Sequence, residues 1–266
     1  MKKIGVLFFS VFLLVFSGCD INPLTGNMSM ALITNEQLFE MASAEYEKFK
    51  SENKVITGTE QALMVERVGQ KTRAAAEKWF ASLKPPQPDY FKDYQWEFTL
   101  VEEKTVNAWA MPGGKIMFYT GILDFMENNE DELAVVMGHE IAHAMLNHTQ
   151  QRMSEAILQQ YGIVIVSQIL GGSSLVELGL TLASNVFIAL PNSRENEYEA
   201  DKYGLYLMTI AGYKPEAAGP FWDRMAKMGK SWEFFSTHPD SDKRAAKLKN
   251  MVTEAKTVAN DVGIIK

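Results

Sequence analysis

The chain has 266 residues, of which 22% are charged, and its formal net charge is −7 at pH 7. It lacks the basic patch that nucleic acids require of a protein partner, so that class of function is excluded. The single cysteine excludes an intramolecular disulfide, and the length suits one globular domain without internal repeats.

Residues 1–18 have the pattern of a secretory signal peptide. Two lysines precede an apolar run at 4–16, and two small residues lead to Cys19. Small residues before a lone cysteine resemble a bacterial lipobox. We therefore predict cleavage before Cys19, its acylation, and anchoring in the bacterial envelope, facing the periplasm, with the choice of membrane left open. The alternative is an uncleaved anchor, although the run is short for a membrane span.

A tether at 19–34 is predicted to lead to the folded domain. The segments 36–50 and 59–80 carry apolar residues at helical spacing, which predicts two helices. The proline-rich run at 84–88 ends this helical region.

A small sheet is predicted next. Residues 94–102 alternate and are rich in aromatic side chains, which indicates a strand. Two further strands are expected at 106–111 and 115–120, joined by a Pro-Gly-Gly turn. An edge strand of such a sheet can pair with an extended peptide, whereas the alternative is an ordinary strand of the core.

His139, Glu140 and His143 form the pattern HExxH inside a predicted helix. Two histidines four residues apart lie about 40° apart around a helix, so both imidazoles can bind one zinc ion. The glutamate between them can reach a water on that metal. This spacing predicts metal-assisted hydrolysis of peptide bonds.

The five-residue pattern also occurs by chance, so its surroundings matter. Asn129 is a predicted N-cap, and acidic residues follow it in the first turn. Apolar residues occupy most sides of the helix, which is therefore expected to be buried. Buried histidines and a buried glutamate are costly without partners, and a metal supplies those partners.

Two apolar segments follow, at 156–170 and 175–190, with a Gly-Gly-Ser-Ser break between them. Polar residues interrupt both, and each is shorter than the roughly 20 residues of a membrane span. We predict buried or cleft-lining helices, with a membrane-facing lid as the alternative.

A third metal ligand is expected from the segment SRENEYEAD. Glu197 and Asp201 lie four residues apart on one helix face. Glu197 is the candidate ligand, and Asp201 can accept a hydrogen bond from a ligating imidazole. Ser193 is a predicted N-cap. The remaining acidic residues, Glu195 and Glu199, are predicted to lie on a solvated helix face.

His148 is an alternative third ligand. It lies five residues past His143, which turns it about 140° away on a continuous helix. Leu146 and Thr149 occupy positions where a metzincin would carry a glycine and a histidine. We therefore predict that His148 is a polar residue near the helix end, and that two histidines and one glutamate hold zinc.

These motifs resemble those of the gluzincin metallopeptidases that include the CAAX-prenyl endopeptidase and HtpX. HEIAH is followed by SRENEYEAD, by STHP at 236–239 and by Arg244, and VNAWAMPGGKI precedes them at 106–116. The segment NPLTG at 22–26 is similar to the Oma-type branch and its stand-alone bacterial relatives. The resemblance covers about residues 22–250.

The resemblance implies a zincin-like fold and a role for each motif residue. His139, His143 and Glu197 match the zinc ligands of the family. Glu140 matches the general base, and Asp201 matches a carboxylate that orients a ligand.

Further roles follow from the resemblance alone. His238 matches a histidine that stabilises the tetrahedral intermediate or gates the open zinc position. The alternative is that His238 is a loop histidine before a proline, without a catalytic role. Arg244 matches an arginine near the site. The strand that contains Asn107 and Ala108 borders the cleft in the family, so these two residues are candidates for contacts with the substrate backbone.

The sequence thus predicts an α+β, mostly helical metallopeptidase domain at 35–258, closed by helices at 215–228 and 241–256 and followed by a tail at 259–266. The favoured function is a lipid-anchored zinc endopeptidase that acts on unfolded or membrane-associated proteins, in envelope quality control by resemblance. The alternative is a chaperone-like or binding factor for envelope assembly. In that case His238 would occupy the open zinc position and keep the protease latent.

Overall fold

The computed structural model describes residues 19–169, 173–228, 233–238 and 244–263. Within them the protein is mostly helical with two small sheets, which confirms the predicted fold class. The predicted signal peptide at 1–18 lies outside the described residues. None of the described helices is both long enough and apolar enough to cross a membrane.

The segment predicted as a tether begins with a hairpin. Strands β1 (Cys19–Ile21) and β2 (Met28–Met30) pair antiparallel around a tight turn. Asn22 shapes this turn, because its Oδ1 accepts hydrogen bonds from two backbone N–H groups within it. The Asn22 Nδ2 also donates to the carbonyl oxygen of Met145 over 2.8 Å. The hairpin is thereby attached to the region that carries HExxH.

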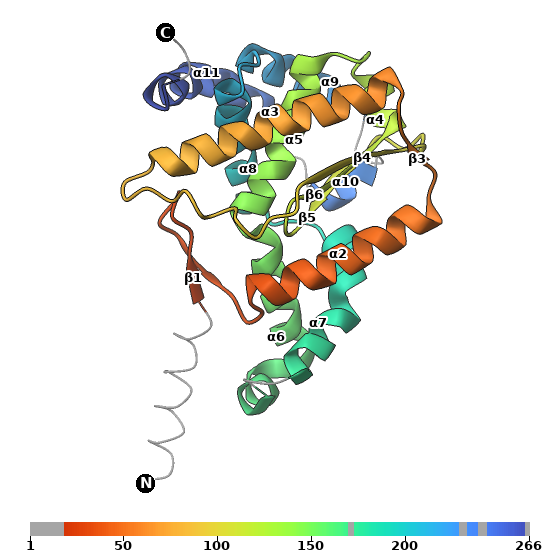
Figure 1. Cartoon of the computed structure of the whole chain (residues 1–266), viewed down its shortest axis with the longest axis vertical. Helices are drawn as coiled ribbons and strands as arrows, with labels where there is room; N and C mark the ends of the chain where they lie inside the picture. The colour runs from red at the N-terminus through yellow and green to blue at the C-terminus, as the bar shows by residue number, and fades with distance from the viewer. Residues whose placement is uncertain (1–18, 170–172, 229–232, 239–243, 264–266) are drawn as a thin grey trace.

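The two predicted N-terminal helices are confirmed as α2 (Asn35–Glu52) and α3 (Glu60–Ser82). A capping box of Thr34 and Gln37 starts α2, and the Thr59 side chain accepts the Ala62 N–H at the start of α3. Figure 1 shows α3 crossing above the sheet and α2 crossing below it.

The predicted strands and turn are also confirmed. The larger sheet has the order β3-β4-β6-β5, so β5 forms one edge. Strands β4 and β6 pair in parallel, whereas β5 and β6 form a hairpin closed by Gly113 and Gly114, both with positive φ. The bounds are β3 (Val55–Ile56), β4 (Glu97–Val101), β5 (Ala108–Met111) and β6 (Lys115–Tyr119).

The sheet separates two hydrophobic clusters, and β5 and β6 are buried on both faces. Successive side chains of a strand point to opposite faces of the sheet, so each strand contributes residues to both clusters. The residues that face α3 and the HExxH helix are Ala108, Ala110, Ile116 and Phe118. The residues that face α2 are Trp109, Met111, Met117 and Tyr119.

The remaining helices complete the domain around this sheet. They are α4 (Thr120–Phe125), α5 (Glu130–Met145), α6 (His148–Ile169), α7 (Ser173–Ser184), the π-helical turn η1 (Asn185–Ala189), α8 (Arg194–Ile210), the 3₁₀ turn η2 (Pro215–Ala217), α9 (Ala218–Lys227), α10 (Glu233–Thr237) and α11 (Arg244–Asp261). The predicted closing helices correspond to η2 with α9 and to α11. The short α10 was not predicted.

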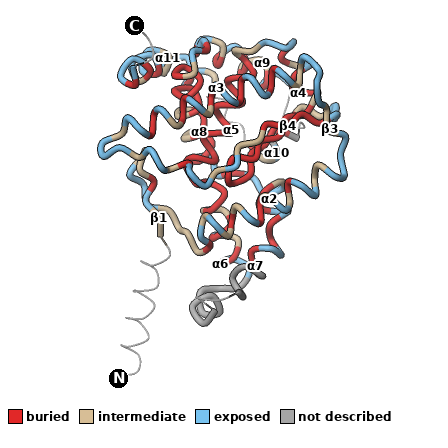
Figure 2. The backbone as a smooth tube through the Cα atoms, in the orientation of Figure 1, coloured by how far each residue is buried: buried red, intermediate tan, exposed pale blue. Residues whose placement is uncertain are grey.

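Helix α5 carries HExxH and lies at the centre of the molecule. The Asn129 side chain caps it, as predicted, and every residue from Glu132 to Met145 is buried. Figure 2 shows this helix as a continuous buried segment.

Helices α5 and α8 cross in backbone contact at Gly138 and Gly204. A Cβ atom built on Gly138 would lie 2.5 Å from the Gly204 carbonyl oxygen, and one on Gly204 would lie 2.7 Å from the His139 backbone nitrogen. Side chains at these positions would therefore force the helices apart. This crossing brings SRENEYEAD to HExxH.

The two predicted apolar segments correspond to α6 and to α7 with η1. Of the predicted break at 171–174, residues 171 and 172 lie outside the described residues, and Ser173 and Ser174 begin α7 instead. The turn η1 lines a cavity beside His143 and His238, through Phe187 and Ile188. This part of the segment is therefore cleft-lining.

Candidate metal centre

Four side chains converge where α5, α8 and the end of α10 meet. His139, His143, Glu197 and His238 each offer one ligand atom, and these atoms all lie within 4.8 Å of one another. The Nε2 atoms of His139 and His143 are 3.1 Å apart, and Glu197 oxygens lie 3.3 and 3.2 Å from them. His238 Nδ1 lies 3.1 Å from Glu197 Oε1. All four residues are buried.

The donor set fits a metal cation, because several nitrogen and oxygen atoms with lone pairs face one another and too few protons lie between them to satisfy all of them. His139 Nδ1 lies 3.0 Å from an Asp201 oxygen, so its proton is held on that side. The His139 and His143 Nε2 atoms then present lone pairs to each other and to a carboxylate. Glu197 Oε2 is buried and accepts no hydrogen bond from any described residue, and Arg244 Nη1 lies 3.4 Å from it. Two imidazoles and one carboxylate are a donor set that suits zinc.

The electrostatics of the cluster favour positive charge. Burial alone would lower the pKa of His139, but Glu197 and Asp201 outweigh it and raise that pKa to about 9. Burial would raise the pKa of Glu197, yet His238 and His139 hold it well below its usual range. Burial lowers the pKa of His143 well below its usual value, which keeps this imidazole neutral. The ionised Glu197 and the neutral His143 are already in the forms that bind metals, whereas a cation would have to displace the proton that His139 holds without one.

Asp201 and Arg244 form a buried ion pair behind His139. The Arg244 guanidinium donates to both Asp201 oxygens, at 2.7 and 2.5 Å, and lies 3.6 Å from the centroid of the Trp222 ring. Burial would raise the pKa of Asp201, but the charge of Arg244 outweighs it and lowers this pKa. Arg244 therefore keeps Asp201 ionised as an acceptor for His139.

Glu140 faces His238 at the edge of the four-residue cluster. Its Oε1 is 3.5 Å from His238 Nε2 and accepts no hydrogen bond within the described part of the chain. Burial raises its pKa. Glu140 lines a cavity together with Arg152 and Thr149. A carboxylate with these properties suits proton transfer.

Ser193 starts α8 as predicted, because its Oγ accepts the Asn196 N–H over 3.1 Å. Glu197 follows one turn later and points into the cluster, whereas Glu195 is exposed on the solvated face, as predicted.

The prediction for His148 was wrong about its surroundings. The helix is not continuous: α5 ends at Met145, Asn147 has a φ of 58°, and α6 begins at His148. His148 is buried, and its Nδ1 lies 2.9 Å from His143 Nδ1. The cluster of candidate ligands does not include it.

The prediction for Glu199 was also wrong, because its side chain is not simply solvated. Its two oxygens contact His148 Nε2 at 3.2 Å and Asn27 Nδ2 at 2.8 Å. The feature that the sequence analysis missed is the break in the helix after HExxH. Because of this break, His148 contacts Glu199 of α8.

The cavity beside Glu140 is lined by Trp109 and Ala110 of the edge strand β5. The predicted contact residues, Asn107 and Ala108, do not line it. Asn107 is buried at the start of β5, where its Oδ1 accepts the Ala108 N–H.

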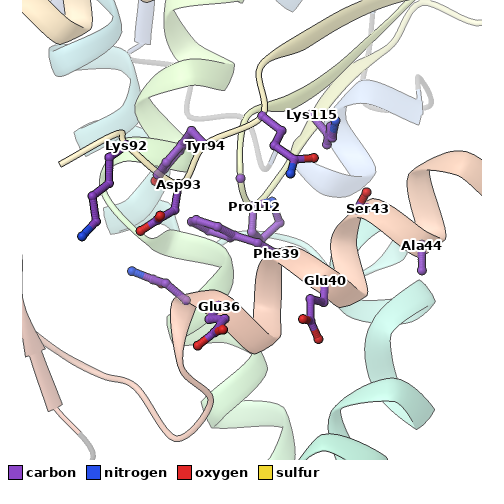
Figure 3. Close-up of a pocket in the computed structure, with 13 residues that line it drawn as sticks. Glu36, Phe39, Glu40, Ser43, Ala44, Lys92, Asp93, Tyr94, Pro112 and Lys115 are labelled. Carbon is purple, nitrogen blue, oxygen red and sulfur yellow. The ribbon is translucent and has the colours of Figure 1, made fainter. Parts of the chain in front are cut away.

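Two further cavities lie near the one beside Glu140, and each shares lining residues with the next. The cavity beside Glu140 shares His143 and Thr149 with a second, smaller cavity. That one shares Asn35, Phe39 and Pro112 with a hollow of about 920 Å³ between the start of α2 and residues 92–95. Figure 3 shows Phe39 and Tyr94 inside this hollow, with Glu36 and Glu40 on its α2 side.

Comparisons with known proteins agree with this geometry. The model of peptidase family M48 matches residues 68–252. The mitochondrial metalloendopeptidase OMA1 of Schizosaccharomyces pombe is 36% identical over 167 residues, which are 61% of this chain and 48% of that protein. Metalloprotease LoiP of Escherichia coli is 32% identical over 159 residues, 56% of this chain and 60% of that protein.

Human OMA1, a mitochondrial metalloendopeptidase, is 26% identical over 272 residues, which cover 96% of this chain and 49% of that protein. The chain spans about half the length of the curated OMA1 relatives that it matches.

Proposed function

Because this chain belongs to peptidase family M48, we propose that it is a zinc-dependent endopeptidase that hydrolyses peptide bonds in protein substrates. The observation that carries the proposal is the convergence of His139, His143 and Glu197 beside Glu140 in one buried cluster. The names of the relatives, metalloendopeptidase and metalloprotease, support the same reaction.

In this proposal His139, His143 and Glu197 hold the zinc ion. When bound, zinc polarises a substrate carbonyl and lowers the pKa of a water toward neutrality. Glu140 accepts the proton of the attacking water and passes it to the leaving nitrogen. Burial raises the pKa of Glu140. A carboxyl group with a raised pKa suits this task, because a group that must both accept and release a proton works best when its pKa is close to the working pH.

His238 has two roles open to it. Its Nε2 faces Glu140 at 3.5 Å, where it can stabilise negative charge on the reacting carbonyl oxygen. Its Nδ1 belongs to the ligand cluster, which favours the second candidate function, a latent protease in which His238 fills the open zinc position. The chain would then act as a chaperone-like or binding factor until His238 moves away.

The substrate is proposed to extend along the edge strand β5. Trp109 and Ala110 line the cavity beside Glu140, and cavities that share lining residues reach Pro112 and the hollow of Figure 3. Backbone groups at an edge are available to pair with an extended peptide. The expected contacts thus move one or two residues along the strand from Asn107 and Ala108.

The site of action is proposed from the sequence. Acylation at Cys19, the first residue of β1, would attach the β1–β2 hairpin to the envelope membrane. The substrates would be unfolded or membrane-associated proteins, and the role would be quality control.

The test is cleavage of unfolded casein by the purified protein before and after zinc chelation. We expect cleavage to stop on chelation and to return with added zinc. Glu140→Gln should remain inactive, whereas Glu195→Gln, on the exposed face of α8, should cleave normally. A Glu140→Gln protein that cleaves as fast as the wild type would refute the proposed mechanism. Zinc binding without any cleavage would favour the latent binding factor.

A further inference from the structure

The two histidines of HExxH have different partners at their Nδ1 atoms. His139 Nδ1 faces the carboxylate of Asp201 at 3.0 Å. His143 Nδ1 faces another imidazole, with His148 Nδ1 at 2.9 Å. Behind His148, its Nε2 lies 3.2 Å from Glu199 Oε2. These distances form an unbroken chain from Glu199 through His148 to His143.

The protons in this chain have one favourable order. An ionised carboxylate only accepts hydrogen bonds, so Glu199 requires the proton of His148 on Nε2. A neutral His148 then has a lone pair at Nδ1, which accepts a proton from His143 Nδ1. This leaves the His143 Nε2 lone pair directed toward Glu197 and His139, where the ligand atoms converge. The opposite tautomer of His148 would place a lone pair against the carboxylate.

The fold holds both outer members of the chain. The left-handed residue Asn147 interrupts the helix between α5 and α6, and His148 lies beside His143 rather than about 140° away around one continuous helix. Asn27 of the β1–β2 hairpin donates to Glu199 Oε1 over 2.8 Å and fixes that carboxylate. Three separate elements, α6, α8 and the hairpin, therefore contribute to the position of the His143 imidazole.

We propose that His148 and Glu199 are positioning residues that fix the tautomer and ring orientation of His143 for metal binding. The inference rests on the proposed function, because it presupposes zinc at His143 Nε2. Hydrogen-bond partners behind a metal ligand commonly change metal affinity by about 10–100-fold when they are removed.

The first test measures the zinc dissociation constant by competition with a chromophoric chelator. We expect His148→Leu to weaken zinc binding by about 10–100-fold, because no acceptor then meets His143 Nδ1. His148→Asn should stay close to the wild type, since the Asn Oδ1 stands where the imidazole Nδ1 stood and can accept the same proton. In the cobalt-loaded proteins, the ligand-field spectrum should shift for His148→Leu and not for His148→Asn.

The second test uses a matched pair on α8. Glu199→Ala should weaken zinc binding, whereas Glu195→Ala, which removes the same charge from an exposed position of the helix, should not. In the His148→Asn background Glu199→Ala should have no further effect, because the histidine whose tautomer it sets is gone.

The outcomes separate this inference from the proposed function. If the wild type binds zinc and His148→Leu and Glu199→Ala bind it equally well, with unchanged cobalt spectra, the positioning role is overturned. A folded wild type that binds no zinc would overturn the proposed function, and this inference with it. If thermal unfolding shows that His148→Leu does not fold, the Glu199→Ala and Glu195→Ala pair decides, because Glu199 is partly exposed and its removal leaves no buried cavity.

Discussion

At the scale of single residues, His238 determines how open the metal centre is. It stacks on Phe234 with a ring-centroid distance of 4.4 Å, and its Nδ1 lies 3.3 Å from His139 Nε2. Its other nitrogen faces Glu140. One side chain thus contacts both the candidate ligands and the candidate base.

If His238 fills the fourth zinc position, its replacement with alanine should raise casein cleavage several-fold, because a larger fraction of the protein is then competent. Initial rates at saturating zinc provide the measurement. Thr237→Ala is the control, since Thr237 lines the same cavity without belonging to the ligand cluster. An unchanged or lower rate would refute latency, and a lower rate would indicate that His238 stabilises the transition state.

Helical geometry explains which site residues the sequence could predict. His139 with His143 and Glu197 with Asp201 are pairs four residues apart, and a helix places such pairs on one face without knowledge of the fold. His148 and Glu199 could not be predicted in this way. Their contact depends on the positive φ of Asn147, for which asparagine is only a weak signal.

At the scale of elements, the crossing of α5 and α8 brings the two motifs together. The closest approach lies at Gly138 and Gly204, next to His139 and two turns after Glu197. Any separation of these helices therefore moves Glu197 and Asp201 away from their imidazole partners.

Gly204→Ala is expected to destabilise the fold by about 1–3 kcal/mol, because its Cβ would overlap the backbone at His139. It should also reduce zinc occupancy. Gly219→Ala in α9 is the matched control, since the three atoms nearest to its Cβ would belong to the flexible Lys249 side chain rather than to backbone. Thermal unfolding and zinc content give the two readouts, and equal stability of both variants would contradict a tight crossing.

Most elements were predictable from local patterns: α2 and α3 are long and periodic, α5 has an N-cap before an apolar run, and β5 and β6 are apolar strands joined by a Pro-Gly-Gly turn. The β1–β2 hairpin was not predicted, because its three-residue strands are held by the long-range bond from Asn22 to Met145. Neither the partner of that bond nor the short α10 leaves a periodic pattern in the sequence.

In the whole molecule the sheet lies between the two hydrophobic clusters and contributes side chains to both. Glu97 of β4 connects α2 to the sheet through ion pairs. Its oxygens lie 2.5 Å from Lys50 Nζ of α2 and 3.2 Å from Lys115 Nζ of β6. Burial would raise the pKa of Glu97, but the two lysines outweigh it and lower that pKa.

This shift predicts how stability depends on pH. A carboxylate whose pKa is lower in the folded state stabilises the fold above its unfolded value of about 4.3, and this contribution is lost as pH falls through the folded pKa. Glu97→Gln should therefore lower the free energy of unfolding at pH 7 by about 1 kcal/mol or less, given its partial exposure. The difference from the wild type should shrink below pH 4.

The control for Glu97 is Glu102→Gln, which breaks a more exposed pair with Lys54 and should change little. Denaturant unfolding across this pH range supplies the measurement. A difference that stays constant with pH would show that Glu97 acts through packing rather than charge.

His139, His143 and Glu197 are proposed to form one zinc centre at the crossing of α5 and α8. The most direct test is the zinc content per folded chain of the wild type, Glu140→Gln and Glu197→Gln. We expect one zinc in the first two proteins and a strong loss in Glu197→Gln, because only that variant removes a ligand. A folded wild type without zinc, or a Glu197→Gln protein that retains it fully, would show that these three residues do not form a zinc centre.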